Sequence, residues 1–293
     1  MRESVSADGL IPIELGDERR SALAERAVHT AATTWFETTL EIAFSDPAAA
    51  AMHRRRYARL PARGPVDLRA RSAIEEDATY FWIEGGPAFR WGTALDASAM
   101  QFLADVVART EYFMERSPYL SFHAAAIRVN GAAVAMTAAS MGGKTTTAIA
   151  CARRGMPLYS DERCIVDGDV VLPFPRAINI RAASLDLLDL DVPRGKDWTF
   201  IDYAELFGDA VLPEPRPLRA IFFITGRGPA AIAEPMPFDT AVASLLGAPL
   251  RGRARGAQRV VEASRLLRLA PPYALTLGTP DETARLIAQT PLP

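Results

Sequence analysis

The strongest indication of the fold in this chain is the segment Ala138-Ala139-Ser140-Met141-Gly142-Gly143-Lys144-Thr145-Thr146. The apolar run 132–136 precedes it and Thr147-Ala148-Ile149-Ala150 follows it, which predicts a strand, a loop and a helix. Backbone N–H groups at the beginning of a helix, together with the helix dipole, favour polyanions. In the pattern G-x-x-x-x-G-K-[ST], Lys144 would reach the outer phosphates and the Thr145 hydroxyl would ligate Mg²⁺. The stretch therefore predicts a phosphate-binding loop for a nucleoside triphosphate.

The match to that pattern departs at one position, because Ala138 stands in place of the first glycine. Alanine disfavours a positive φ, so the backbone at residue 138 has fewer allowed conformations than a glycine would have. Lysine is rare in this chain: of 33 Lys and Arg residues, only Lys144 and Lys196 are lysines. Because this chain has so few lysines, a Lys–Thr pair would seldom arise in it by chance. The alternative interpretation is a glycine-rich turn that caps an ordinary helix.

Composition narrows the class of protein. The 293 residues are 49% hydrophobic and 23% charged, which is typical of a globular protein with a sizeable core. A net charge of −2 indicates no general attraction to nucleic acid or to an anionic membrane, and no apolar segment is long enough to span one. Two cysteines without a pairing framework fit a reducing cytosol. We therefore expect a cytoplasmic protein with neither nucleic acid nor membrane as partner.

The first 118 residues carry no chemical signature and read as a mixed α+β region. Helical periodicity predicts a helix over 21–42, alternation predicts a β-hairpin over 79–91, and apolar spacing predicts a helix over 97–114. We place the boundary at Arg116-Ser117-Pro118, which gives an N-terminal region, 1–118, and a catalytic domain, 119–293.

A strand over 120–129, the turn dipeptide Asn130-Gly131 and a return strand over 132–137 predict that the loop strand is the second arm of a hairpin. The sheet should therefore be mixed and the domain α/β. The strand 156–160 ends at Asp161 and Glu162, and we expect it beside the loop strand. Ligands of open α/β sheets collect at the carboxyl ends of strands. One carboxylate would hold Mg²⁺ and the other would accept a hydroxyl proton; alternatively, the pair is exposed and only ends a strand.

Several motifs together resemble the catalytic domain of HPr kinase/phosphorylase. They are His123-Ala124-Ala125-Ala126, 137–146, Arg154-Gly155, Ser160-Asp161-Glu162-Arg163 and Asn179-Ile180-Arg181. The order and spacing of these motifs agree with that family. More closely, the chain looks like the related kinases of bacterial peptide natural-product pathways, including the lasso-peptide kinases. The resemblance covers about residues 119–290.

This resemblance implies a P-loop kinase domain of the HPr kinase and phosphoenolpyruvate carboxykinase type, which uses ATP and Mg²⁺. Asp161 would be the base, and Lys144, His123 and Arg181 would lie around the transferred phosphoryl group. The predicted nucleotide-binding residues are Ala139, Ser140, Met141, Gly142, Gly143, Lys144, Thr145 and Thr146, and the predicted metal ligands are Thr145, Glu162 and Asn179. For His123, a satisfied core histidine is the alternative, and for Arg181 a surface ion pair.

Two residues depart from the family pattern. Glu162 stands where the family has aspartate, and Asn179 replaces a glutamate that helps to bind the metal. A neutral amide is a weaker Mg²⁺ ligand than a carboxylate, so metal affinity and reverse phosphorolysis are in question. Lys196 lies in a Gly/Pro loop and is a candidate phosphate contact, with chance placement as the alternative.

The function expected from the sequence is an ATP-dependent kinase that phosphorylates a serine-type hydroxyl of a peptide or protein, in the first place a ribosomally made natural-product precursor. The 1–118 region and the 191–200 loop are candidate recognition surfaces. Two alternatives stay open: a nucleotide-binding regulator without transfer activity, and a kinase of a small metabolite. Homo-oligomers occur in the parent family, and this sequence leaves the oligomeric state open.

Overall fold

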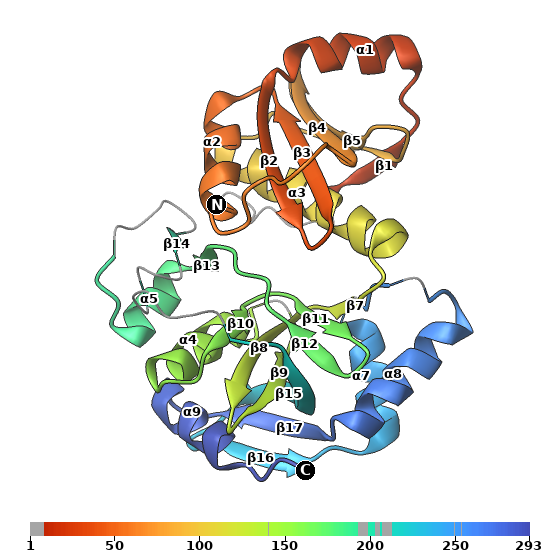
Figure 1. Ribbon diagram of the computed structural model, residues 1–293. Coiled ribbons are helices and arrows are strands. Elements are labelled where there is room, and N and C mark those ends of the chain that lie inside the picture. The colour runs from red at the N-terminus through yellow and green to blue at the C-terminus, as the bar shows by residue number, and fades with distance from the viewer. Residues whose placement is uncertain are drawn as a thin grey trace. The chain divides into compact units, whose positions relative to one another are not determined.

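The structure is a computed structural model, and it describes residues 9–139, 141–192, 199–202, 206, 213–248, 250–252 and 254–293. Two of the predicted site residues, Ser140 and Lys196, lie outside the described residues. The chain forms two compact units, Met1–Tyr112 and Phe113–Pro293 (Figure 1). The division falls in a π-helical turn, Tyr112–Arg116. That the N-terminal part recognises the substrate stays a prediction.

In its described residues, the first unit consists of a six-stranded sheet and three α-helices. Its strand order is β1-β6-β5-β4-β3-β2, and all neighbours are antiparallel except β3 and β4, which are joined by the crossover helix α2. The elements are β1 (Ile11–Ile13), α1 (Asp17–Arg26), β2 (His29–Trp35), β3 (Thr38–Phe44), α2 (Pro47–Arg56), β4 (Leu68–Glu75), β5 (Ala78–Ile83), β6 (Ala88–Trp91) and α3 (Ala97–Glu111). The hairpin predicted over 79–91 and the helix predicted over 97–114 are confirmed.

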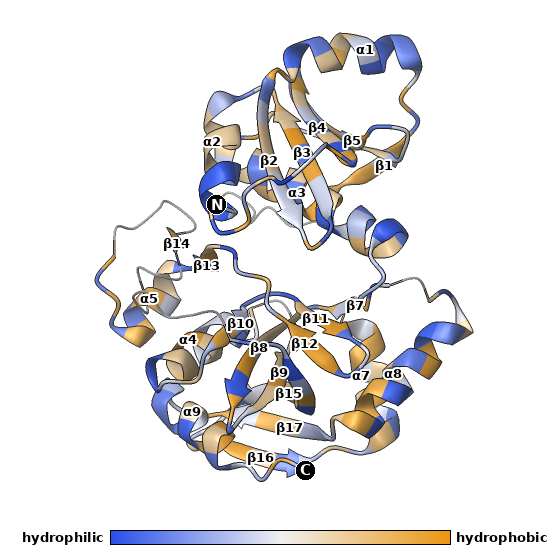
Figure 2. Ribbon diagram, viewed as in Figure 1, coloured by the Kyte–Doolittle hydropathy of each residue, from blue (hydrophilic) through white to orange (hydrophobic). Residues whose placement is uncertain are grey.

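Both faces of this sheet are covered. Ala43 and Trp82 pack with Leu23 of α1, which is mostly hydrophilic elsewhere (Figure 2). Phe44, the next residue along β3, contacts His53 of α2 on the other face. Every residue of β5 is consequently buried.

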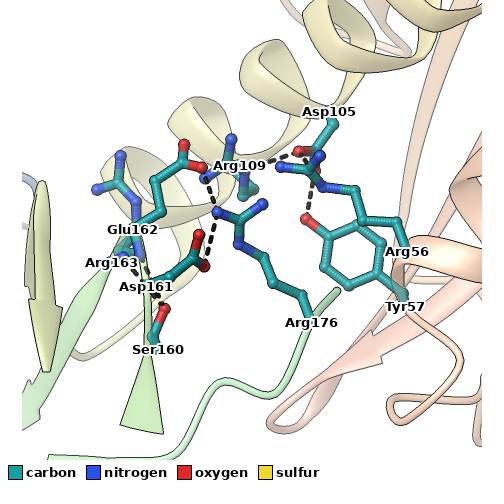
Figure 3. Close-up of polar contacts among 9 residues, drawn as sticks. All are labelled: Arg56, Tyr57, Asp105, Arg109, Ser160, Asp161, Glu162, Arg163 and Arg176. Carbon is teal, nitrogen blue, oxygen red and sulfur yellow. Dashed lines mark hydrogen bonds and ion pairs between the residues drawn. The ribbon is translucent and has the colours of Figure 1, made fainter. Parts of the chain in front are cut away.

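A buried polar cluster joins α2 and α3 in this unit (Figure 3). The Asp105 carboxylate lies 3.3 Å from Arg56 Nε and 3.1 Å from Arg109 Nε, and it accepts a hydrogen bond from the Tyr57 hydroxyl. All these side chains are buried. Because a buried charge is costly unless it is paired, the cluster fixes how the two helices pack.

The predicted helix over 21–42 is wrong beyond Arg26. The chain forms the hairpin of β2 and β3 instead, with Phe36 in the turn at a φ of 56°. This segment is rich in threonine, whose β-branched side chain favours strands, and pairing with β4 and packing against two helix layers outweigh its helical periodicity.

The second unit contains a nine-stranded mixed sheet. Its main path is β10-β8-β9-β15-β12-β11-β7, β17 pairs with both β15 and β16, and β15 is parallel to β9 and to β17. The strands are β7 (Leu120–Phe122), β8 (Ala124–Val129), β9 (Ala132–Thr137), β10 (Leu158–Ser160), β11 (Cys164–Asp167), β12 (Val170–Leu172), β15 (Arg216–Arg227), β16 (Ile232–Pro235) and β17 (Pro272–Leu277). A separate ribbon pairs β13 (Ile178–Ile180) with β14 (Thr199–Ile201). The predicted mixed α/β class is confirmed.

Helices cover this sheet on both faces (Figure 1). Alternation along β8 decides which side chains face which layer: Ala125 and Ile127 pack in one cluster, whereas Ala124 and Ala126 pack in the other. One layer is α4 (Lys144–Arg153), α5 (Ala182–Leu188) and α9 (Pro280–Gln289); the other is α7 (Phe238–Gly247) and α8 (Ala257–Leu269).

The predicted hairpin that enters the loop is confirmed as β8 and β9, which pair from Ala124–Thr137 to Val129–Ala132. The predicted neighbour of the loop strand is wrong, because β10 pairs with β8 and not with β9. Each step from β10 to β8 to β9 is antiparallel, so β10 and β9 run in the same direction. Their carboxyl ends still meet at one edge of the sheet, and the amino end of β8 lies between them.

Candidate functional site

The phosphate-loop sequence forms a strand, a loop and a helix, as predicted. β9 ends at Thr137, and α4 begins at Lys144 with Gly143 as its N-cap residue at a φ of 98°. The first turn of α4 contains no acidic residue, and no side chain of the described residues caps it. The amides at this helix end therefore have no acidic side chain of the first turn of α4 as a competing partner, which favours the binding of an anion.

Ala138 replaces the first motif glycine without backbone strain. Among the described loop residues, Met141 and Gly143 have a positive φ, of 63° and 98°. Ala138 does not have a positive φ. A Cβ added at Gly142 would lie only 2.6 Å from the Ala138 Cβ. The methyl group of Ala138 is therefore tolerated because residue 142 has no side chain.

Gly143 has two separate reasons to be glycine. Its φ of 98° is one that L side chains rarely adopt. In addition, an added Cβ would lie 2.8 Å from Leu277 Cδ1 and 3.2 Å from Arg227 Nη2. The end of the loop is therefore packed closely against the carboxyl ends of β15 and β17.

Lys144 is buried at the beginning of α4, with only 7% of its surface exposed. Its Nζ donates hydrogen bonds to the carbonyl oxygens of Ala138 at 2.9 Å and Ala139 at 3.2 Å. Burial lowers the pKa of Lys144 to about 8, and the nearby carboxylates of Glu162 and Asp161 oppose this shift. The lysine and the acidic pair, which are separated in sequence, therefore share one electrostatic site.

The acidic pair lies directly after β10. Asp161 is buried and Glu162 is half-buried, so the pair is not an exposed strand end. Its catalytic role stays a prediction. The Ser160 hydroxyl accepts hydrogen bonds from the backbone N–H groups of Glu162 at 3.4 Å and Arg163 at 3.2 Å. This turn places both carboxylates at the edge of the sheet where β10 ends.

Arg176 is the residue of this site that sequence reasoning missed. Its side chain is fully buried, and its Nη2 donates to Asp161 Oδ1 at 3.0 Å and to Glu162 Oε2 (Figure 3). Its Nε and Nη1 are also buried and have no hydrogen-bond partner among the described residues. A usable signal exists in the sequence, since Arg176 is a single charge in the apolar segment 170–178 and a charge in such a segment needs a buried partner.

His123 lies in the bend between β7 and β8, where the predicted strand 120–129 is interrupted. The interruption arises because β7 pairs with β11, whereas β8 pairs with β9 and β10. The His123 carbonyl accepts a hydrogen bond from the Thr137 hydroxyl at 3.0 Å. His123 also lines a cavity of about 450 Å³ together with Ala138, Ala139 and the end of α7. His123 therefore lies next to the first residues of the loop, and its catalytic role stays a prediction.

The remaining predicted residues lie around α5. Asn179 is on β13, and its Oδ1 is buried without a hydrogen-bond partner among the described residues. Arg181 is the N-cap residue of α5. The Thr146 hydroxyl donates to Ser184 Oγ at 2.9 Å, which joins the first turn of α4 to α5. Thr146 is thus engaged in packing the two helices, whereas its predicted contact with the nucleotide would be through its backbone N–H.

The donor set suits Mg²⁺ in a nucleotide complex. Magnesium is usually held by one or two carboxylates together with substrate phosphates, with no complete protein cage. In the described part of the chain no group of three or more His, Cys, Asp or Glu residues could hold a metal ion. The Asp161–Glu162 pair, the Thr145 hydroxyl and the unpartnered Asn179 oxygen are hard oxygen donors of the kind that the ion prefers.

None of the helices among the described residues is long and apolar enough to cross a membrane. No protein-family model matches the chain, and no curated protein matches it. Among solved structures the chain is similar to the HPr(Ser) kinase/phosphatase from Coxiella burnetii, at 14% sequence identity and a TM-score of 0.31. That similarity covers 57% of this chain and 93% of the Coxiella burnetii chain.

Proposed function

We propose that this protein is an ATP-dependent kinase that transfers the γ-phosphoryl group to a serine-type hydroxyl of a peptide or protein. The observation that carries the proposal is that Lys144, which begins the helix behind a phosphate-type loop, lies in the field of the buried Asp161 and half-buried Glu162. A loop of this type accounts for polyphosphate binding, and a carboxylate beside it accounts for activation of an acceptor.

Each residue then has a role in the transfer. Lys144 and the backbone N–H groups of 139–146 bind the β- and γ-phosphates. Asp161 takes the proton of the acceptor hydroxyl while the new oxygen–phosphorus bond forms and the bond to the β-phosphate oxygen breaks, which releases ADP. Arg181 offsets the charge that spreads over the transferred group.

The metal ion would be held by Thr145, Glu162 and Asn179, and when bound it neutralises charge on the phosphate oxygens. His123, in the bend beside the beginning of the loop, orients the substrate phosphates from the cavity side. This ligand set and this role come from the sequence resemblance, and the packing around the loop is compatible with both.

The acceptor class also comes from the sequence resemblance, which favours a ribosomally made natural-product precursor of the lasso-peptide type. A serine hydroxyl in such an acceptor would need a base beside the phosphate loop.

The test is an intact-mass assay in which the full chain and Mg·ATP are incubated with serine-containing precursor peptides. We expect a mass gain of one phosphate on a peptide with the wild type, and none with Lys144→Ala or Asp161→Asn. Asp161→Asn should keep its affinity for ATP, because the proposed base is not needed for binding. The matched control is Asp167→Asn, which changes an exposed carboxylate at the end of β11 and should leave the transfer unchanged.

One observation favours a second function, a nucleotide-binding regulator without transfer activity. Arg176 forms ion pairs with both carboxylates that would serve as base and metal ligand. If this pairing persisted in the nucleotide complex, the chain would bind ATP and phosphorylate nothing. Affinity for ATP without a phosphorylated product from any supplied peptide or small hydroxyl compound would select this second function.

A further inference from the structure

We propose that Arg227 is a second cationic group of the phosphate loop, and that it binds the α- and β-phosphates of the nucleotide on the leaving-group side of the transfer. This inference rests on the proposed function and adds a nucleotide-binding residue to it. Arg227 stands outside every motif that the sequence singled out.

The backbone of β15 carries Arg227 to the loop. β15 pairs with the loop strand up to the Phe223–Thr137 pair and then continues to Arg227 beside β17. Arg227 is paired with Leu277, and the N–H of Gly228 donates to the Leu277 carbonyl at 2.8 Å. The position of Arg227 at the carboxyl edge is therefore fixed by backbone pairing, and only its side chain is adjustable.

The side chain of Arg227 lies against the loop. A Cβ at Gly143 would be 3.2 Å from Arg227 Nη2, so the guanidinium occupies the space next to the N-cap residue of α4. Two cationic groups and the positive end of the helix dipole thus meet at one helix end that has no acidic residue in its first turn. Such a concentration of positive charge is stabilised when a polyanion binds.

The charge of Arg227 is not compensated in the described part of the chain. β15 carries three arginines, and two of them have acidic partners: Arg216 lies 2.6 Å from Glu214, and Arg219 lies 3.9 Å from Asp169. The guanidinium of Arg227, which is exposed, has neither a hydrogen bond nor an ion pair with a described residue. Its five donors are available to phosphate oxygens, for which the planar guanidinium is well suited.

Strand order decides which phosphates Arg227 meets. Asp161 follows β10, which is two strands from β9 on one side, whereas Arg227 ends β15, which is next to β9 on the other side. With neighbouring strands about 5 Å apart, the base and Arg227 lie on opposite sides of the loop. Transfer places the attacking and leaving oxygens in line, on opposite sides of the γ-phosphorus. If the acceptor lies at Asp161, the departing ADP lies toward Arg227.

The experiment measures Kd of the full chain for Mg·ATP and Mg·ADP by titration calorimetry. Arg227→Ala should weaken both by the same factor, about 10-fold to 100-fold, as expected when one charge-assisted contact is lost. Arg227→Lys should recover part of this loss. The matched control is Arg216→Ala, at the other end of β15, which should change neither affinity more than about twofold because it removes a surface ion pair.

Lys144→Ala serves as the reference that separates this inference from the proposed function. Loss of ATP binding in Lys144→Ala with unchanged affinities in Arg227→Ala overturns the role of Arg227 alone. If Arg227→Ala weakens the binding of ATP but not of ADP, the contact is with the γ-phosphate and the leaving-group assignment is overturned. If Arg216→Ala weakens nucleotide binding as much as Arg227→Ala does, the specific contact is overturned. If the wild type binds neither nucleotide, the proposed function and this inference fall together.

Discussion

Arg176 and Asp161 form a buried ion pair at the carboxyl edge of the second unit's sheet, with Nη2 and Oδ1 3.0 Å apart. The same nitrogen also donates to Glu162, so one guanidinium holds the whole acidic pair. The buried Lys144 also interacts electrostatically with both carboxylates. Removing Arg176 would take this ion pair away from the buried Asp161 carboxylate, which is costly in such surroundings.

We therefore expect strong coupling between Arg176 and Asp161 in a double-mutant cycle. Arg176→Met should lower the free energy of unfolding by about 3 kcal/mol or more, because it removes the guanidinium that pairs with the buried Asp161 carboxylate. Asp161→Asn should lower it by less, because Arg176 keeps Glu162 as a partner. The double variant should lose much less than the sum. Chemical denaturation followed by circular dichroism measures all three values.

The matched control for this cycle is the exposed pair of Arg255 and Glu115, whose charged atoms are 2.9 Å apart with side chains 50% and 61% exposed. Solvent screens such a pair, so its coupling energy should be about 0–1 kcal/mol. Additive effects of Arg176→Met and Asp161→Asn, similar to those of the exposed pair, would contradict the buried ion pair.

Nucleotide affinity should depend on pH through Lys144. Its pKa is lowered to about 8 by burial, so above pH 8 the free protein holds the side chain mostly neutral. A bound polyphosphate favours the charged form and raises this pKa again, so binding takes up a proton. We expect Kd for ATP to be constant below pH 7 and to increase above pH 8, by at most about tenfold per pH unit.

Lys144→Arg is the control for this pH dependence, because arginine stays charged throughout the range. The variant should bind more weakly but with a Kd that is constant from pH 7 to pH 9.5. Calorimetry in buffers of different ionisation enthalpy should show proton uptake for the wild type alone. A wild-type Kd that does not change across this range would refute the coupling of Lys144 to the phosphates.

Gly143 and Gly155 offer a comparison between backbone strain and packing. Both have a positive φ, 98° and 83°, but a Cβ at Gly155 would meet nothing within 4 Å. Gly155→Ala should lower the free energy of unfolding by about 1–2 kcal/mol, from the left-handed backbone alone. Gly143→Ala should lower it by about 2–5 kcal/mol, because Leu277 and Arg227 must also move. Equal losses, measured by thermal or urea unfolding, would show that the loop is not packed against β15 and β17.

The first unit should lose stability in acid through His53. This histidine is fully buried between Phe44 and Tyr57, and burial lowers its pKa to about 4. The unfolded chain binds a proton below pH 6.5 and the folded chain only near pH 4, so the free energy of unfolding should fall in that interval by up to about 1.4 kcal/mol per pH unit. The slope of unfolding free energy against pH measures it.

His53→Phe should remove this part of the acid sensitivity without loss of packing, since both ring nitrogens of His53 lack a hydrogen-bond partner among the described residues. His29→Gln, at a half-exposed histidine on β2, is the control and should keep the wild-type slope. The same slope in His53→Phe as in the wild type would assign the acid sensitivity to other groups.

Local features of the sequence predicted much of the fold and part of the site. The hairpin at Asn130-Gly131 and the helix after Gly143 follow from turn chemistry and from residues close in the chain. The error over 21–42 has the opposite origin. The apolar residues of this segment recur at helical spacing, but its threonines favour a strand. Pairing with β4, which is distant in the chain, selects the strand.

The local sequence was enough to predict the strand, the loop and the beginning of α4 at Lys144, because these depend on the backbone of one continuous segment. The groups that lie around that loop come from distant parts of the chain, and local patterns did not identify them. β8 separates β10 from the loop strand, Arg176 holds the acidic pair, and Arg227 lies against Gly143. The physical reason is that strand order and buried ion pairs depend on contacts between residues far apart in the chain, whose partners no local pattern identifies.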